Sequence, residues 1–310
     1  MLFRSDVAGA ADQTEPYSKT CRVTRARDNS IQKQEPFKAF DNLYYVGPGY
    51  VSVWLIPTSA GIILIDTAQE PYVDHVIDSI KKSGFDLKDI KYILLSHGHL
   101  DHVGGAARIQ ELSGARVAAL GEDWDMIEKL GTTPGRDGSA PPRMPKRDMV
   151  LKEGDTLTLG GETLKFYKHP GHTAGSLSAE FTLFDNGTPH KAFMFGGPGP
   201  RGGVNGAQQF LDSMNRVAAI QGIEIAVNVH SWLTSYPYPG GGILERENKL
   251  KLRKPGEANV FVDPAAWTQW VKIAQAGAQQ YLDEQKKKEA AAKYFRSEEH
   301  TSELQSHVRI

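Results

Sequence analysis

The feature that most constrains the fold is a short apolar run that stops at a cluster of titratable side chains. The run KYILLS (91–96) is followed by HGHLDHVGG (97–105). A short apolar run without alternation is typical of a strand that is buried on both faces of a sheet. The glycine pair Gly104 and Gly105 leads into a segment that is expected to be helical. The sequence therefore predicts a buried strand, a loop dense in titratable groups and a helix.

This loop has the residue types and the spacing of a metal site. His97 and His99 can direct their imidazoles toward one point, while Asp101 and His102 can serve a neighbouring point. Imidazole and carboxylate are ligands that suit zinc. A histidine-rich surface loop is the alternative, and one His-x-His pair alone would favour it. The full string in its strand–loop–helix context favours metal binding.

Two other expected strands also end in histidine-bearing loops. The run ETLKFYKH is followed by a Pro-Gly turn that presents His172, and the run IEIAVNV is followed by His230. Enzyme sites are commonly built on loops that a rigid sheet positions. We therefore expect these two histidines to complete the site. Three other histidines are not assigned to it: His75, His169 and His190. His75 lies in an expected helix, and His169 can simply close its strand.

The rest of the chain alternates between short strands and helices. Apolar runs predict further strands at 43–47, 50–58, 61–67, 115–120, 155–161, 176–184 and 191–197. Apolar spacing or length predicts helices at 70–83, 208–220 and 264–294. Residues 132–148 are rich in Gly, Pro and charge, and we expect a long loop there. This order of elements indicates an α/β sandwich, with sheets inside and helices outside.

Charge and cysteine content exclude several classes of partner. The 310 residues carry 36 basic and 37 acidic side chains, a formal net charge of −1, which leaves no basic footprint for nucleic acid. No apolar run approaches the roughly 18 residues of a membrane span. The single cysteine, Cys21, excludes an internal disulfide and a cysteine zinc knuckle. We expect a small-molecule substrate, without a nucleic-acid or membrane partner; the oligomeric state stays open.

Both ends of the chain resemble translated sequencing-adapter DNA, as in metagenomic sequence. The tail RSEEHTSELQSH (296–307) and the head MLFRS (1–5) match the two strands of one adapter. Such segments are excluded from fold reasoning. We expect a polar N-terminal segment at 1–40, a folded domain at 41–282, and a charged helical end with the adapter tail at 283–310. The compartment is periplasmic or extracellular if a signal peptide has been lost, and otherwise cytoplasmic.

Together these motifs resemble the metallo-β-lactamase superfamily, whose signature is His-x-His-x-Asp-His. The resemblance covers about Leu43 to Leu282 and is greatest to the third subclass of metallo-β-lactamases and its relatives. It rests on NLYYVG, LLSHGHLDHVGGA, GHTAGS and RKPGEANVFVDP. It implies an αββα sandwich with a C-terminal helical extension, and two zinc ions at one sheet edge.

The resemblance also divides the ligands between the two zinc ions. Six side chains would form two sets of three: His97, His99 and His172 for the first ion, and Asp101, His102 and His230 for the second. Asp66, in LIDT, matches the family's aspartate that supports the metal loop from a strand end. Spacing alone equally allows an ordinary turn residue at that position.

Two departures from the family pattern bear on the substrate. Many superfamily hydrolases have an aspartate that bridges both metals after the strand equivalent to KAFMFGG, and Gly197 stands at the corresponding position. The third subclass also lacks this bridge but places a serine pair nearby, which binds the substrate carboxylate. The stretch GGPGPRGGVNG has no serine; Arg201 or Asn205 could substitute, and a Gly/Pro-rich loop is the plain interpretation. These departures put β-lactam specificity in doubt, but not the metal site.

The expected chemistry is zinc-dependent hydrolysis of an amide or ester bond, most similar to that of a β-lactamase. Two zinc ions about 3.5–4 Å apart can share a water and lower its pKa toward roughly 7, so the bridging hydroxide is the nucleophile. Asp101 would orient it and shuttle its proton. The alternatives are a lactone, thioester or phosphodiester hydrolase on the same metals, and a non-catalytic zinc- or ligand-binding protein. Gly197 counts against most lactonases and thioesterases, and the complete ligand set counts against a non-catalytic protein.

The substrate is expected to lie between the 132–148 loop and SWLTSYPYPGG, which follows His230. Trp232, Tyr236 and Tyr238 are amphipathic aromatic residues that could wall an apolar pocket. Ordinary packing is the alternative for any one of them. The prediction is therefore collective: at least one of the three contacts the substrate.

Overall fold

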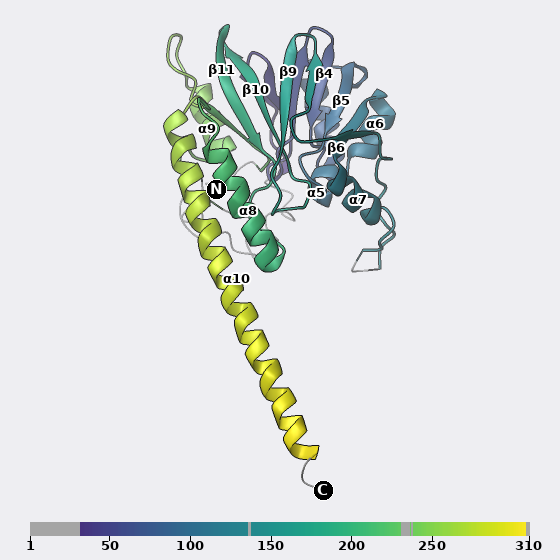
Figure 1. Ribbon diagram of the computed structural model, residues 1–310. Coiled ribbons are helices and arrows are strands. Elements are labelled where there is room, and N and C mark those ends of the chain that lie inside the picture. The colour runs from purple at the N-terminus through teal and green to yellow at the C-terminus, as the bar shows by residue number, and fades with distance from the viewer. Residues whose placement is uncertain (1–31, 136–137, 231–235, 237, 308–310) are drawn as a thin grey trace, which may run out of the picture.

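Two β-sheets lie face to face in the described part of the chain, and helices cover the outer face of each (Figure 1). The structure, a computed structural model, describes residues 32–135, 138–230, 236 and 238–307. Buried apolar side chains fill three layers, one between the sheets and one between each sheet and its helices. This is an αββα sandwich, which confirms the fold class predicted from the sequence.

The first sheet contains seven strands in chain order. They are β1 (Phe37–Phe40), β2 (Leu43–Tyr45), β3 (Trp54–Thr58), β4 (Gly61–Ile65), β5 (Ile90–Leu94), β6 (Arg116–Leu120) and β7 (Met149–Leu151). Strands β1 to β4 pair antiparallel, and β4 to β7 pair parallel. Parallel neighbours need crossover connections. Five helical segments lie in those connections: α4 (Val73–Lys82), η1 (Leu87–Asp89), α5 (Leu100–Val103), α6 (Ala106–Ser113) and α7 (Gly121–Leu130).

The second sheet contains five strands in the order β12-β11-β10-β9-β8. They are β8 (Thr156–Leu159), β9 (Glu162–Lys168), β10 (Leu177–Asp185), β11 (Thr188–Phe195) and β12 (Ile225–Asn228). All neighbours are antiparallel except β11 and β12. Helix α8 (Gly203–Ala218) connects that parallel pair and packs with α10 (Pro264–His307) on the outer face, while α9 (Ile243–Lys251) contacts β1.

Strand β5 shows why the apolar run of the opening motif cannot tolerate polar substitutions. Leu94 faces the layer between the two sheets, whereas Ile93 and Leu95 face the layer under the helices. Strand β9 is different, because only Leu164 and Phe166 are buried, and Lys165 between them is exposed. The continuous apolar run of β5 therefore matches a strand that is covered on both faces. The alternating run of β9 matches a strand that is buried on one face only.

Most expected elements are confirmed, but six elements lie where the sequence pattern predicts none: β1, β7, η1, α5, α7 and α9. The two strands have only four and three residues, too few for alternation to be recognised. Helix α7 presents few apolar residues to the core, chiefly Trp124 and Ile127. The helix expected at 208–220 begins earlier, at Gly203.

Residues 50–53, predicted as strand, instead form a tight loop before β3. The Val46 amide donates to the Val53 carbonyl at 2.9 Å, and Val51 forms an isolated antiparallel bridge with His230. A side chain at Gly47 would place its Cβ 2.5 Å from the Val53 nitrogen, so only glycine permits this close return. The loop matters because it reaches the histidine that follows β12.

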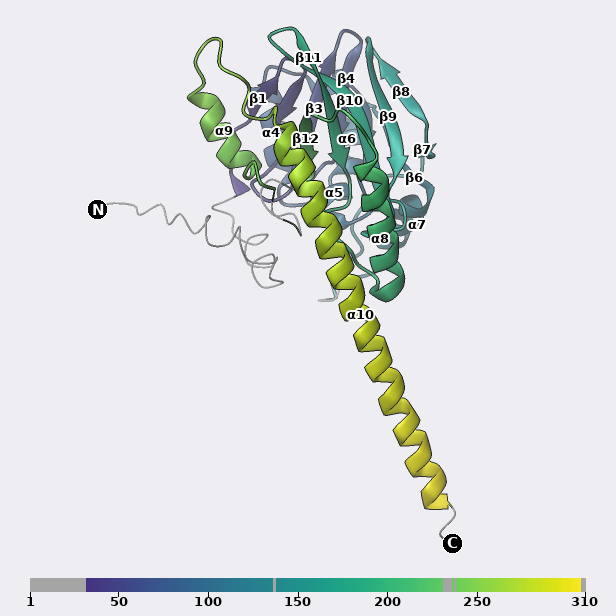
Figure 2. The ribbon, with the colours of Figure 1, turned by 60° about the vertical axis from the view of Figure 1, so that its left-hand side comes forward.

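The C-terminal helix α10 is the most extended feature of the molecule. It packs against α8 over its first part and then projects well beyond the sheets (Figure 2). The helix expected at 264–294 thus continues to His307. The adapter origin of its last residues stays a prediction. None of the described helices combines the length and the apolar character that crossing a bilayer requires.

One titratable side chain, His169, is packed among aromatic rings directly after β9. Its ring stacks on Tyr167 at 6.0 Å between centroids and lies 5.6 Å from Phe195. Neither ring nitrogen has a hydrogen-bond partner in the described part of the chain. Burial lowers the pKa of His169 to about 3, with a smaller contribution from the positive charge of Arg216.

This burial predicts a loss of stability in mild acid. The unfolded chain takes up the proton near the ordinary histidine pKa of 6.5, whereas the folded chain takes it up only near 3. The stabilisation is therefore complete above about pH 6.5 and falls progressively toward pH 3, by about 2 kcal/mol between pH 7 and pH 5. In urea unfolding of metal-free protein, His169→Phe should flatten this pH dependence. His190→Gln, a histidine of β11 outside the ring cluster, is the control; parallel profiles for parent and His169→Phe would contradict the prediction.

Candidate metal centre

The opening motif lies at the edge of the first sheet where β5 ends. Ser96 follows the strand, and the next residues carry His97 and His99 into the short helix α5, which begins at Leu100. The amide and the hydroxyl of Thr67 both donate to the His102 carbonyl at 2.9 Å, which ties α5 to the end of β4. The motif is thus a loop and one helical turn attached to two parallel strands.

The structure brings the first predicted set of histidines together. His97, His99 and His172 each place a ring nitrogen within 4.8 Å of the others. The Nε2 atom of His172 lies 3.1 Å from Nδ1 of His99, and the rings of His97 and His172 have centroids 4.6 Å apart. Two of these residues come from the first sheet and one comes from the loop after β9 in the second.

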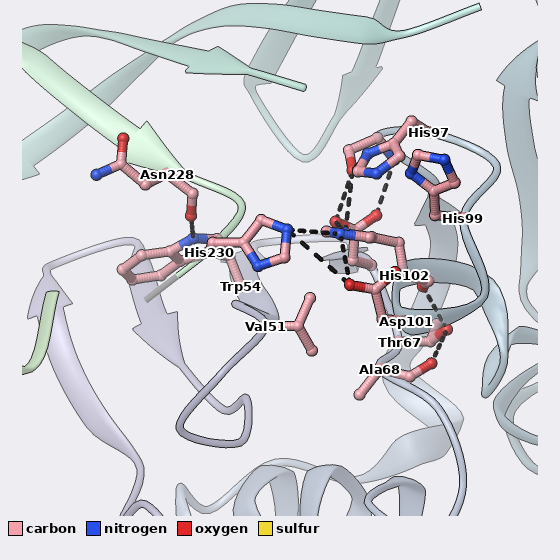
Figure 3. A network of polar contacts seen from close by, with 12 residues as sticks. Val51, Trp54, Thr67, Ala68, His97, His99, Asp101, His102, Asn228 and His230 are labelled. Atoms are coloured by element: carbon pink, nitrogen blue, oxygen red, sulfur yellow. Dashed lines mark hydrogen bonds and ion pairs between the residues drawn. The ribbon is translucent and has the colours of Figure 1, made fainter. Parts of the chain in front are cut away.

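The second predicted set also converges, as Figure 3 shows from close by. The Nε2 atoms of His102 and His230 are 3.2 Å apart, and an Asp101 carboxylate oxygen lies 3.6 Å from the former and 4.0 Å from the latter. The two sets adjoin each other, because the ring centroids of His97 and His102 are 3.9 Å apart. All six predicted side chains therefore lie in one cluster.

Hydrogen bonds on the far side of three imidazoles determine which nitrogen faces the cluster. Nδ1 of His172 lies 2.7 Å from the Gly199 carbonyl, Nδ1 of His102 lies 2.7 Å from the Asp66 carboxylate, and Nδ1 of His230 lies 3.4 Å from the Tyr50 carbonyl. Each of these acceptors requires a proton on Nδ1, so each Nε2 directs a lone pair into the cluster.

Asp66 orients the motif by hydrogen bonds to Ser96 and His102. Its carboxylate accepts from the Ser96 amide at 2.8 Å, from the Ser96 hydroxyl at 2.7 Å and from His102. Because that hydroxyl proton points to Asp66, the Ser96 oxygen accepts from Nδ1 of His97 at 3.1 Å. Nε2 of His97 then carries a lone pair, and it is buried without a hydrogen-bond partner in the described part of the chain. These contacts match the supporting role expected for Asp66, which stays a prediction.

The converging lone pairs fit a metal cation. Burial lowers the pKa of His97 and of His172 well below the usual range, and the neighbouring histidines lower both further. Both rings are therefore neutral near pH 7, which is the form that binds metals. Electron pairs at such short separations repel each other unless a positive charge lies between them. A donor set of imidazoles and one carboxylate suits zinc.

The loop before β3 and the first residue of β3 hold His230 in place. The Ser52 amide donates to the Val229 carbonyl at 2.9 Å. The Trp54 indole donates to the Asn228 carbonyl at 2.9 Å, as Figure 3 shows. The Tyr50 ring meets the imidazole edge to face, with centroids 5.0 Å apart. The first sheet thus positions a histidine that belongs to the second.

Gly197 lies against the first set, where the family's bridging aspartate is expected. A Cβ at this position would be 2.7 Å from Cβ of His172 and 3.0 Å from the Ser176 hydroxyl oxygen. Neither contact is with the far end of a flexible chain, so a side chain cannot enter without moving His172. The absence of a bridging carboxylate is thus built into the backbone.

The predicted substrate-contacting aromatic residues are only partly placed. Trp232 lies outside the described residues. Tyr236 and Tyr238 belong to the apolar layer under α8 and α10, where Tyr236 packs on Phe210 with centroids 6.1 Å apart. Their contact with a substrate, and the role of the 132–148 loop, stay predictions.

Sequence reasoning missed residues that support the cluster through backbone contacts. Tyr50, Trp54 and the buried Asp123 of α7 are the main examples. Asp123 stands in GEDWD beside two other acids, Glu122 and Asp125. Only the folded structure distinguishes Asp123 from these two acids, because no local sequence pattern indicates which of the three is buried.

Two stacked sheets with a histidine-rich edge define the metallo-β-lactamase fold. Residues 46–182 match the family described as the Metallo-beta-lactamase superfamily. The match covers the part of the chain that carries the His-x-His-x-Asp-His string and His172, in agreement with the resemblance found in its sequence.

Solved structures with this fold match almost over their whole length. BJP-1, a subclass B3 metallo-beta-lactamase of Bradyrhizobium japonicum, has a TM-score of 0.73 and 29% identity, covering 84% of this chain and 98% of that one. FEZ-1 from Legionella gormanii has a TM-score of 0.72 and 28% identity, covering 83% and 98%.

Curated relatives match over a shorter part. The hydroxyacylglutathione hydrolase of Pseudomonas putida (strain GB-1) is 37% identical over 97 residues, 31% of this chain and 29% of that protein. That of Acidiphilium cryptum is 28% identical over 128 residues, 41% and 43%. The chain thus spans less than half the length of these relatives. Both groups of relatives are named as hydrolytic enzymes, in agreement with the expectation of a hydrolase.

Removing the Asp66 carboxylate should destabilise the protein even without metal. Asp66→Ala leaves two protons of Ser96 and one of His102 without their acceptor in a buried site, at a cost of roughly 2–5 kcal/mol. Urea unfolding of metal-free protein measures this loss. Asp78→Ala, at an exposed position of α4, is the control and should change stability by less than about 0.5 kcal/mol. Equal stability of the two variants would show that Asp66 is not a structural support.

Proposed function

We propose that this chain is a hydrolase with two zinc ions, and that it opens an amide bond of the β-lactam type. The observation that carries the proposal is the pair of adjoining sets of donors, with neutral imidazoles and one carboxylate. His97, His99 and His172 would hold one ion, and Asp101, His102 and His230 the other. When bound, zinc supplies Lewis acidity that activates water and polarises a carbonyl group.

The open side of the cluster indicates where the substrate approaches. Of the six proposed ligands, His99 and Asp101 are partly exposed, while the other four are buried. A scissile bond therefore meets the cluster on the side of these two residues. The Asp101 carboxylate can accept a proton there from the attacking water and return it to the departing nitrogen.

The supporting residues keep this site rigid. Asp66 fixes the protonated nitrogen of His102, and the Gly199 carbonyl fixes that of His172. Such partners orient imidazole ligands and increase their basicity. Preorganised ligands need no rearrangement when charge develops in the transition state.

Two observations favour a β-lactam amide over a thioester. The chain covers nearly the whole length of the subclass B3 enzymes but less than half of the hydroxyacylglutathione hydrolases. In addition, the backbone at Gly197 leaves no space for the bridging aspartate of many other superfamily hydrolases. The local identity of 37% to a hydroxyacylglutathione hydrolase keeps thioester hydrolysis as the second candidate.

Zinc content tests the proposed site directly. Reconstituted protein should hold close to two zinc ions per chain, because six donors divide into two sets of three. His102→Ala should weaken one ion selectively and retain the other. Metal analysis combined with titration against a chromophoric chelator measures both quantities. Protein that binds no zinc at neutral pH would contradict the proposal.

Activity tests the substrate class. We expect a chromogenic cephalosporin to be hydrolysed faster than a lactone, a glutathione thioester or a phosphodiester, each in the presence of zinc. Asp101→Asn should reduce kcat by roughly 10²–10⁴-fold, because it removes a ligand and the proton acceptor together. Asp78→Asn is the control and should behave as the parent. Faster turnover of the thioester would establish the second candidate function instead.

A further inference from the structure

A buried carboxylate outside the six proposed ligands connects the two loops that carry the first set. Asp123, in the first turn of α7, is only 1% exposed. Its Oδ2 accepts from the Gly98 amide at 2.7 Å, and Gly98 stands between His97 and His99. It also accepts from the hydroxyl of Thr173 at 2.7 Å and, through Oδ1, from the Gly175 amide at 2.9 Å. One carboxylate therefore holds both loops.

The direction of these hydrogen bonds is determined by the donors. The Thr173 amide donates to the Ser176 hydroxyl oxygen at 3.1 Å, and the two hydroxyl oxygens are 2.8 Å apart. The Ser176 proton therefore points to Thr173, and the Thr173 proton points to Asp123. Burial raises the pKa of the Asp123 carboxyl, and the three donors oppose that rise. Two amides and one hydroxyl that donate to one carboxyl group suit its ionised form, as does its place in the first turn of a helix.

Close packing shows that both loops rest on the start of α7. A Cβ at Gly98 would meet the Met126 sulfur at 3.1 Å and the Asp123 carbonyl oxygen at 3.2 Å. A Cβ at Gly175 would lie 2.7 Å from the Asp123 nitrogen. The loops cannot move closer, and the carboxylate prevents them from moving apart. The start of α7 therefore determines how far His172 lies from His97 and His99.

We propose that Asp123 is a positioning residue that sets the zinc affinity of the His97, His99 and His172 set without touching the metal. This inference rests on the proposed function, because it assumes that the set binds zinc. The second set should not depend on Asp123, because α5 is held by Thr67 and His102 is held by Asp66.

Two backgrounds separate the sets for measurement. His230→Ala retains the complete first set, and His172→Ala retains the complete second set. In each background the zinc dissociation constant is measured by competition with a chromophoric chelator, with and without Asp123→Asn. We expect a roughly 10- to 100-fold rise in the first background, in the range found for residues that orient metal ligands. In the second background the change should stay within about twofold.

Matched variants distinguish positioning from a general loss of structure. Asp125→Asn makes the same change on the exposed side of α7, where Glu128 still pairs with Arg147, and should leave both sets as in the parent. Thr173→Val removes one donor to Asp123 and should weaken the first set alone, by a smaller factor. Thr173→Ser restores the hydroxyl and should restore the affinity. This pair decides the question even if Asp123→Asn does not fold, as judged by circular dichroism of metal-free protein.

The outcomes are separable. Selective weakening of the first set supports the proposal. Equal weakening of both sets, or unchanged affinity in the first background with both Asp123→Asn and Thr173→Val, overturns it while leaving two functional zinc sites. Absence of zinc binding in both backgrounds overturns the proposed function, and this inference with it.

Discussion

The structure depends on one electrostatic constraint: five imidazoles and a carboxylate lie in a small volume at a sheet edge, and four of the imidazoles direct an Nε2 lone pair into it. Such an arrangement is repulsive unless a cation binds, so the fold must hold each group in place. It does so with acceptors on the far side of the rings, namely Asp66, the Gly199 carbonyl and the Tyr50 carbonyl. Two of these acceptors are backbone carbonyls, so the loop conformations and the site are determined together.

Backbone geometry also limits the chemistry. Gly197 lies so close to His172 that a side chain cannot be added without displacing a proposed ligand. A single substitution at Gly197 could therefore not introduce a bridging carboxylate, because the loop itself would also have to shift.

From the sequence, the six side chains that converge can be predicted, but most of the residues around them cannot. The His-x-His-x-Asp-His string and two strand-ending histidines suffice for the six side chains, because strand ends meet at one edge. Asp123 and Trp54 were not predictable, since they act through backbone amides and carbonyls that no residue pattern encodes. Strands β1 and β7 are too short to show a period, and helix α7 presents too few apolar residues to the core to show one. The loop before β3 has the residue pattern of a strand, and only the structure reveals the close return of the chain at Gly47.

Each set of donors draws on both sheets, which gives bound metal a topological role. His99 and His172 are 73 residues apart in the chain, and His102 and His230 are 128 apart. A cation shared across each pair would act as a cross-link, closing long loops as disulfides do in oxidising compartments. In a chain with one cysteine, such cross-links would restrict the unfolded ensemble without sulfur chemistry. Resistance to unfolding would then depend on free zinc concentration and not on the redox state.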